Sequence, residues 1–252
     1  MDREALIGEW KREETEPFAG WDFSHLAGRW MLEEPPWSYA DRVRELMHGA
    51  KSLLDLGTGG GERLLEMRAD WPPTVAATEG YPPNLALAAQ RLAPYGVEVQ
   101  EADSNERQIL PYDDGSFDLV ISRHSAFGGA EVMRVLAPGG VFFTQQVHGR
   151  SGEDLQARFG AVPEWPYATM EYFAGKLTAA GLDLAESKEW SGKMVFADVG
   201  AIVYYLKATP WIVPDFSVAT HLDALLGLQE EVEAGKQLAF GRRLYILKAR
   251  KG

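Results

Sequence analysis

Between residues 50 and 147, short apolar runs alternate with segments of helical pattern, and this alternation constrains the fold more than any other feature. The apolar runs have the length and the turn-rich borders of buried strands. Successive strands joined by single helices form parallel βαβ units, whose right-handed crossovers place helices on both faces of a sheet. We therefore expect an α/β fold with a doubly wound, mostly parallel sheet of seven strands, at residues 51–56, 74–78, 97–100, 117–122, 141–147, 182–190 and 242–250.

The regions on either side of this alternation follow another pattern. Residues 1–49 contain helical stretches that glycine and proline interrupt, so we expect an N-terminal helical cap before a main domain over residues 50–252. Residues 196–208 are apolar enough to be a helix or a strand, but their spacing and the proline that ends them favour a helix. With an amphipathic helix over residues 221–235, they predict a helical lid inserted at about residues 194–238, before the last strand.

The amino-acid composition limits the kinds of molecule that the protein could bind. The net charge is −12, whereas a nucleic-acid binder needs a basic surface, so a small-molecule partner is favoured despite a basic segment at residues 240–252. No apolar run is long enough to span a bilayer, and the acidic N-terminus lacks a signal-peptide core, so we expect a cytoplasmic protein with no membrane partner. The absence of cysteine excludes disulfides and thiolate metal sites, and we expect no metal. The oligomeric state is left open between monomer and homodimer.

A glycine-rich turn, DLGTGGG, follows the first strand of the alternation. In doubly wound folds, ligands bind outside the carboxyl ends of the strands, where this turn lies. A dinucleotide-binding G-x-G-x-x-G motif would need a glycine at Glu62, where a carboxylate would repel a pyrophosphate. This disfavours a nicotinamide dehydrogenase, and the lack of a Gly-Lys-Ser/Thr sequence argues against a phosphate-binding loop. A plain tight turn is the alternative reading.

The spacing resembles the first motif of class I S-adenosylmethionine-dependent methyltransferases, in which an acid, here Asp55, lies two residues before a G-x-G-x-G turn. Glu79 at the end of the second strand and Asp103 at the end of the third match two further acids of that family. The stretches LPYDDGSFDLV and EVMRVLAPGGVFF match the approaches to its fourth and fifth strands. The resemblance covers roughly residues 50–147 and implies a Rossmann-like fold, S-adenosyl-L-methionine as cofactor and S-adenosyl-L-homocysteine as product.

The resemblance also implies roles for single residues. Asp55 would orient the ammonium end of the cofactor, Glu79 would accept hydrogen bonds from both ribose hydroxyls, and Asp103 would accept one from the adenine amine. Tyr81 could pack on the adenine, and Arg123 could meet the cofactor carboxylate or an acidic substrate, or simply form a salt bridge. Taken alone, Glu79 and Asp103 would each be read as solvated acids at strand ends, and only their joint occurrence in register favours the cofactor. The expected cofactor-binding residues are Asp55, Gly57, Thr58, Gly59, Gly61, Glu79, Gly80, Tyr81, Asp103, Ser104 and Arg123.

The methyl acceptor can need a general base to remove its proton, and the five histidines of the chain are the candidates for this base. His124, just past the fourth strand, is the first candidate for a catalytic residue, and His148, just past the fifth, is the second. Either could instead be an ordinary hydrogen-bonded or solvated histidine. Trp30, Trp37 and Tyr39 are candidates for an aromatic wall of the substrate cleft, or for packing that attaches the N-terminal segment to the core.

The predicted lid resembles the helical insertion of trans-aconitate methyltransferases and related small-molecule enzymes. Its YYLKATPW sequence departs from theirs, so their substrate does not carry over. The function expected from these patterns is in-line transfer of a methyl group to a small molecule in a lidded cleft. The alternatives are a methyltransferase of ribosomal RNA or protein, and a non-catalytic regulator that binds S-adenosylmethionine. A related ribosomal RNA group carries a cysteine zinc module, which this chain cannot form.

Overall fold

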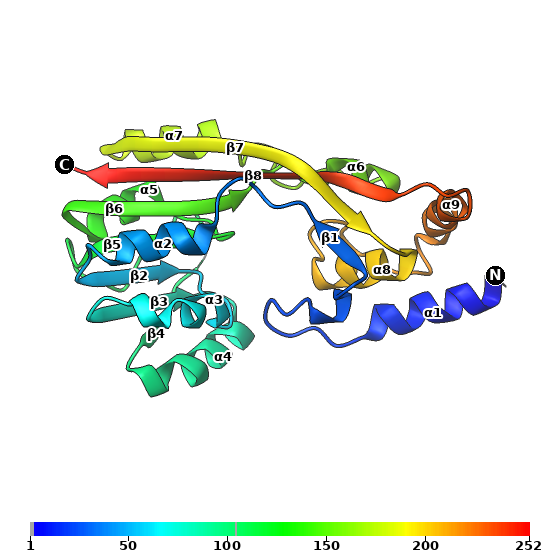
Figure 1. The fold of residues 1–252 in the computed structure, drawn as a ribbon, viewed down its shortest axis with the longest axis horizontal. Coiled ribbons are helices and arrows are strands. Elements are labelled where there is room, and N and C mark those ends of the chain that lie inside the picture. Colours follow the sequence, from blue (N-terminus) through cyan, green and yellow to red (C-terminus); the bar gives the residue numbers. More distant parts are fainter. Residues whose placement is uncertain (1–2, 104) are drawn as a thin grey trace. The chain divides into compact units, whose positions relative to one another are not determined.

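The computed structural model describes residues 3–103 and 105–252, which divide into two compact units. Each unit is assembled from three separate stretches of the chain (Figure 1). Unit 1 contains the described residues up to 35, residues 149–167 and residues 191–243, and unit 2 contains residues 36–148, 168–190 and 244–252. These boundaries differ from those expected at residues 49, 194 and 238, and the functional division into cap, main domain and lid stays a prediction.

Unit 2 is built on the twisted sheet that the alternation predicts. Its strand order is β7-β8-β6-β5-β2-β3-β4, with β8 antiparallel to β6 and the pairs from β6 to β4 parallel. The central strands are buried on both faces, which explains their continuous apolar runs. The strands are β2 (Ser52–Leu56), β3 (Thr74–Glu79), β4 (Glu98–Glu101), β5 (Phe117–Arg123), β6 (Leu136–Val147), β7 (Leu182–Phe196) and β8 (Leu238–Lys251).

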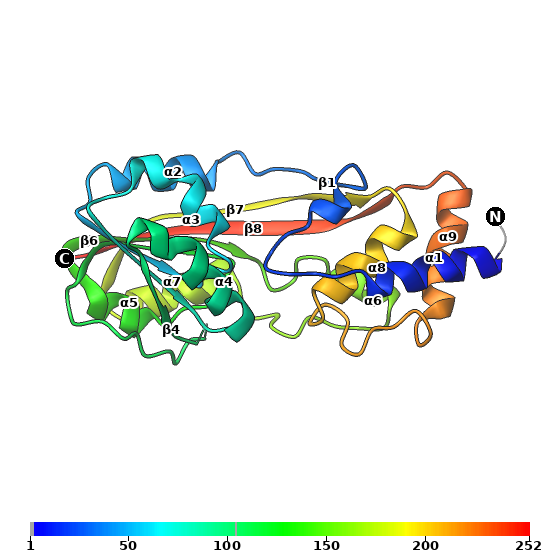
Figure 2. The same cartoon turned by 90° about the horizontal axis from the view of Figure 1, so that it is seen from below.

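Helices cover both faces of this sheet, as expected for a doubly wound fold. Apolar side chains alternate along β2, so that Leu53 packs with α2, α3 and α4, whereas Leu54 packs with α5 and α7. Figure 2 shows α2 and α5 on opposite sides of the sheet. The helices are α2 (Tyr39–Met47), α3 (Glu62–Glu66), α4 (Pro82–Leu92), α5 (Gly129–Val135) and α7 (Met170–Ala179), with short 3-10 turns η2 (Arg68–Asp70) and η3 (Ala93–Tyr95).

Unit 1 packs its helices around a separate apolar core. The helical reading of residues 196–208 is confirmed from Val199 onward, whereas Phe196 still belongs to β7. The side chain of Asp198 caps this helix by accepting a hydrogen bond from the Ala201 backbone N–H at 2.8 Å. The elements of unit 1 are α1 (Arg3–Thr15), η1 (Ser24–Leu26), β1 (Trp30–Leu32), α6 (Glu153–Arg158), α8 (Val199–Ala208), α9 (Leu222–Glu233) and the adjoining parts of β7 and β8.

Two details differ from the sequence prediction while the α/β fold class is confirmed. The described residues form a sheet of eight strands and not seven, because β1 pairs antiparallel with the end of β7 in a segment expected to be helical. In addition, β6 begins at Leu136, earlier than the expected residue 141, because Leu136 pairs with Phe117 across an irregular register. In both segments, pairing with a strand that is distant in the sequence determines the backbone conformation. The local pattern of apolar and polar residues does not reveal such pairing.

Candidate functional site

The glycine turn after β2 adopts a backbone that few other residues could adopt. Gly57, Gly59 and Gly61 have φ values of 67°, 63° and 83°, in the left-handed region where a side chain is strained. The Thr58 backbone N–H donates to the carbonyl of Thr78 at 2.9 Å, and Gly61 then forms the N-cap of α3. The turn therefore folds the chain across the carboxyl ends of β2 and β3.

The Glu79 carboxylate holds this turn in place from the end of β3. It is 7% exposed, and its Oε2 accepts a hydrogen bond from the Gly59 backbone N–H at 2.7 Å. Its Oε1 accepts from the backbone N–H groups of Gly80 and Tyr81, both at 2.9 Å. Because a carboxylate has about four acceptor positions, Glu79 can accept about one further hydrogen bond without releasing the turn. The two ribose contacts expected of it stay a prediction.

Asp55, at the end of β2, is a carboxylate buried with few compensating partners. It is 7% exposed, and burial, followed by the charge of Glu79, raises its pKa from 3.8 to about 6. Thr58 and Arg123 act in the opposite direction. The Thr58 hydroxyl lies close enough to lower this pKa, yet it is buried and makes no hydrogen bond of ordinary geometry. A cationic donor placed at Asp55 would relieve this cost.

Tyr39, the first residue of α2, points a buried hydroxyl at the same region. Its ring stacks on Phe143, with centroids 5.6 Å apart and planes 18° from parallel, and the Arg123 guanidinium lies 6.0 Å from its centroid. Burial, followed by the charge of Asp55, raises the pKa of Tyr39 well above its usual value. The hydroxyl has no hydrogen-bond partner in the described structure. Asp55, Arg123 and Tyr39 thus combine a carboxylate, a guanidinium and an unsatisfied hydroxyl.

Beyond the end of β5, His124 lies in an unusual backbone conformation. Its φ is 56°, and its backbone N–H donates to the carbonyl of Gln145 on β6 at 2.9 Å. The Gln145 side chain accepts a hydrogen bond from Trp37 Nε1 at 2.9 Å, and its Nε2 lies 3.1 Å from His124 Nε2. Gln146 points to the other face, where it donates to Thr144 Oγ1 at 2.6 Å. Gln145 is therefore the glutamine associated with His124.

The remaining predicted site residues lie in different surroundings. Asp103 follows β4 and is exposed, and the Tyr81 side chain is 61% exposed beside the glycine turn. Ser104 lies outside the described residues. His148 follows β6 and is buried. The structure thus brings together the glycine turn, Asp55, Glu79 and Arg123, and it leaves the roles of all these residues as predictions.

Sequence reasoning missed one contact that shapes the turn. Arg91 on α4 donates to the carbonyl of Gly60 at 3.1 Å and forms an ion pair with Glu62. A Cβ atom at Gly60 would lie only 2.4 Å from Glu62 Oε1, so this ion pair occupies the space beside the glycine. No sequence signal links these residues, because the contact depends on how α4 packs over the turn.

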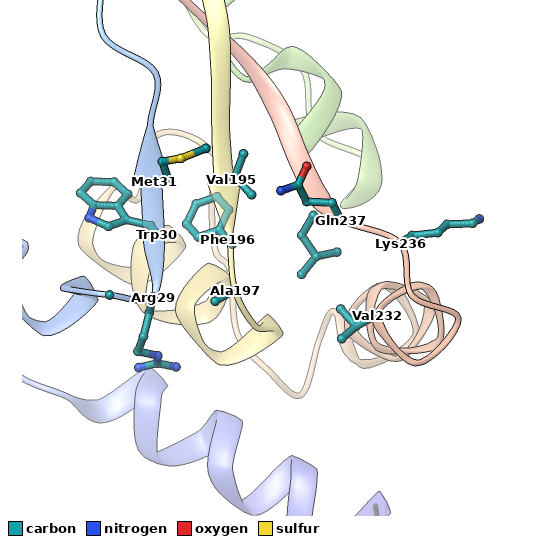
Figure 3. A pocket seen from close by; sticks show the side chains of 11 residues that line it. Arg29, Trp30, Met31, Val195, Phe196, Ala197, Val232, Lys236 and Gln237 are labelled. Carbon is teal, nitrogen blue, oxygen red and sulfur yellow. The ribbon is translucent and has the colours of Figure 1, made fainter.

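Unit 1 contains a pocket of about 350 Å³ with largely apolar walls. Trp30, Phe196 and Val232 contribute to it, from β1, β7 and α9 (Figure 3). Arg29 points away toward α1, where it pairs with Glu13 at 2.7 Å. Trp30 therefore lines a pocket of unit 1, whereas Trp37 and Tyr39, the other aromatic residues considered for a substrate wall, belong to unit 2.

In the part of the chain that the structure describes, no cluster of three or more histidine, aspartate or glutamate side chains could hold a metal ion. Over the same residues, no helix combines the length and the apolar character needed to cross a membrane.

Comparison with known proteins identifies the class of the domain. Residues 54–144 match the family described as "Methyltransferase domain". Residues 54–144 are therefore similar to a methyltransferase domain, which agrees with the resemblance to class I S-adenosylmethionine-dependent methyltransferases seen in the sequence. The match covers β2 to β6, which include the glycine turn, Asp55 and Glu79. S-adenosyl-L-methionine is supported as its cofactor.

Two curated relatives share sequence with the chain. A demethylmenaquinone methyltransferase of Thermus thermophilus is 34% identical over 139 residues, which cover 47% of this chain and 60% of that protein. A demethylmenaquinone methyltransferase of Deinococcus radiodurans is 30% identical over 112 residues, which cover 41% of this chain and 46% of that protein. The chain thus matches less than two thirds of the length of either relative.

A solved structure extends the likeness in fold to the whole chain. A functionally unknown protein from Deinococcus radiodurans R1 is similar with a TM-score of 0.58 and 18% sequence identity. The alignment covers 99% of this chain and 98% of that protein. At this identity the likeness concerns the fold alone.

Proposed function

We propose that the protein transfers a methyl group from S-adenosyl-L-methionine to a small-molecule acceptor by in-line displacement. The observation that carries the proposal is that Arg123 lies beside the buried side chains of Asp55 and Tyr39 next to the glycine turn, in residues similar to a methyltransferase domain. When bound, the cofactor supplies an activated methyl group on a sulfonium, so the protein's contribution is alignment and exclusion of water.

The described residues fit the amino acid end of this cofactor. An ammonium needs an anionic acceptor, and Asp55 is a carboxylate whose pKa is raised by burial and by the charge of Glu79, so a cation beside it would be stabilising. A carboxylate needs a cation and a donor, and Arg123 with the unsatisfied hydroxyl of Tyr39 can provide them. Glu79 has about one acceptor position left for a ribose hydroxyl while it holds the turn.

The net charge of the chain and the names of the two curated relatives both support a small-molecule acceptor. A net charge of −12 opposes a long polyanion, which argues against ribosomal RNA. Both curated relatives are named for demethylmenaquinone, so we take demethylmenaquinone as the first acceptor to test. The location in the cytoplasm and the choice between monomer and homodimer stay predictions.

Calorimetric titration with S-adenosyl-L-homocysteine tests the cofactor site. We expect the full chain to bind, and Asp55→Asn and Glu79→Ala to weaken binding about 10- to 150-fold, the effect of losing a hydrogen bond to a charged group. Asp118→Asn is the matched control, because Asp118 accepts from the Lys51 backbone N–H at 2.8 Å at the opposite end of the sheet. Absence of binding, or equal binding by all three variants, would contradict the proposal.

Methyl transfer is then measured with labelled S-adenosyl-L-methionine. Demethylmenaquinone and a panel of small phenols, amines and carboxylic acids serve as acceptors, and cell RNA and protein serve as competing classes. Label that enters only RNA or protein would favour the macromolecular alternatives. Tight cofactor binding with no label transferred to any acceptor would favour a non-catalytic regulator.

A further inference from the structure

Three side chains from separate segments form a hydrogen-bonded row in unit 2. The Trp37 indole N–H donates to Gln145 Oε1 at 2.9 Å, and Gln145 Nε2 lies 3.1 Å from His124 Nε2. Gln145 is buried, so its amide cannot turn to water for partners. The row begins in the segment before α2, passes through β6 and ends just after β5.

The protons of this row can be assigned from the chemistry of its groups. An indole nitrogen only donates, so the atom of Gln145 that faces Trp37 is the amide oxygen. The amide nitrogen, which also only donates, then faces His124 Nε2. His124 Nε2 must accept this hydrogen bond and carries no proton, so the proton of the neutral ring resides on Nδ1. If the His124 imidazole were doubly protonated, its Nε2–H and the amide N–H of Gln145 would both be donors, and no acceptor would lie between them.

The backbone fixes His124 in the same place. Its φ of 56° lies in the left-handed region, which has a conformational cost for a residue with a side chain. The hydrogen bond from its backbone N–H to the Gln145 carbonyl, at 2.9 Å, opposes that cost. Gln145 therefore holds both the backbone and the ring of His124, at the carboxyl end of β5 where ligands of such sheets bind.

We propose that Trp37 and Gln145 act as positioning residues that hold His124 as the neutral tautomer protonated at Nδ1. In methyl transfer, His124 then meets the acceptor as a hydrogen-bond donor and not as the base that the sequence suggested. This role, which rests on the proposed function, fits an acceptor that presents a carbonyl, phenolate or carboxylate oxygen beside the methylated atom.

Nitrogen-15 NMR of histidine-labelled full-length protein reads the tautomer without cofactor or acceptor. His124→Asn identifies the His124 signals among the five histidines. At pH 7.5 we expect Nδ1 to be protonated and Nε2 to be unprotonated. Gln145→Glu replaces the amide donor with an acceptor, so we expect the Nε2 of His124 to gain a proton.

Two tryptophan variants form a matched pair. Trp37→Phe removes the indole N–H and lets the amide rotate, so we expect signals of both tautomers. Trp71→Phe removes an indole N–H that donates to the Leu64 carbonyl at 3.0 Å, and we expect it to leave the His124 signals unchanged. A protonated Nε2 in the unmodified protein, or an unchanged tautomer in Gln145→Glu, would overturn the inference, whether or not S-adenosyl-L-homocysteine binds.

The kcat for methyl transfer to demethylmenaquinone distinguishes a hydrogen-bond donor role of His124 from a general-base role. Asparagine and glycine both tolerate the positive φ but remove the imidazole Nδ1–H, so His124→Asn and His124→Gly should each lose only about two- to tenfold in kcat, the effect of a neutral hydrogen bond. A general base would make both variants lose about a hundredfold or more, and that result would refute the donor role. If demethylmenaquinone is not methylated, the tautomer measured by NMR decides the inference.

Discussion

Replacing Asp55 with asparagine should make the folded protein more stable while it weakens cofactor binding. The Asp55 carboxyl is buried, and its folded-state pKa of about 6 lies above the ordinary value of 3.8. A carboxyl with a raised pKa binds its proton more tightly when folded, so ionisation at higher pH favours the unfolded chain. Asparagine fills a similar volume without the charge, and the cost of ionisation disappears.

The size of the effect follows from the two pKa values. A rise from 3.8 to about 6 corresponds to about 3 kcal/mol at pH 8, where both states are ionised. The cost falls to about 1.5 kcal/mol at pH 5 and to about 0.5 kcal/mol at pH 4, as the folded state keeps its proton. In a chain of this size, about 3 kcal/mol corresponds to a rise of roughly 6–12 °C in Tm.

Urea unfolding at pH 5 and pH 8 measures this difference directly. Asp55→Asn should gain stability over the unmodified protein at pH 8 and gain roughly half as much at pH 5. Asp118→Asn, the matched control, should show no such gain, because Asp118 bonds to the Lys51 backbone N–H at 2.8 Å. If Asp55→Asn is less stable at pH 8, or if its gain is equal at both pH values, the reasoning about Asp55 is refuted.

Two further predictions concern the turn and the start of α2. Gly61→Ala should lower stability by about 1–3 kcal/mol in urea unfolding, because φ is 83° and the new Cβ would lie 3.1 Å from Leu92 Cγ. Gly60→Ala meets only the ends of flexible side chains and should cost less, so equal costs would contradict the strain argument. Hydrogen bonds from Arg42 lower the pKa of Glu186 from 4.5 to about 2. Glu186→Gln should therefore cost about 1 kcal/mol at pH 7, and this difference should shrink as the pH falls from 4.5 toward 2; a loss that is equal at pH 3 and pH 7 would argue against the ion pair.

The positions of the glycine turn, Asp55 and Glu79 in the sheet could be predicted because their signals are local. The glycine turn lies directly between a strand and a helix, and Asp55 and Glu79 lie at the ends of neighbouring strands. In a parallel sheet such ends share one edge, so position in the sequence already implies position in space. The α/β fold class and the similarity to a methyltransferase domain could be predicted from the sequence for the same reason.

The partners of these residues could not be predicted, because they depend on packing between distant segments. The stacking of Tyr39 on Phe143 and the hydrogen bond from Trp37 to Gln145 join the start of α2 to β6. Neither contact leaves a periodic pattern in the sequence. The three-residue strand β1 was missed for a related reason, since its pairing with β7 decides its conformation.

The order of β6, β7 and β8 in the chain sets the order of events during synthesis. In the sheet of unit 2, β8 pairs with β6 from Val147↔Leu244 to Val141↔Arg250, and it also separates β6 from β7. Between β6 and this part of β8, the ribosome makes the whole of α6, α7, β7, α8 and α9. A nascent chain therefore carries β6 with an unpaired edge until residue 244 and its successors emerge. Such an edge is open to pairing with other chains, so shielding of β6 during translation becomes a requirement of this topology.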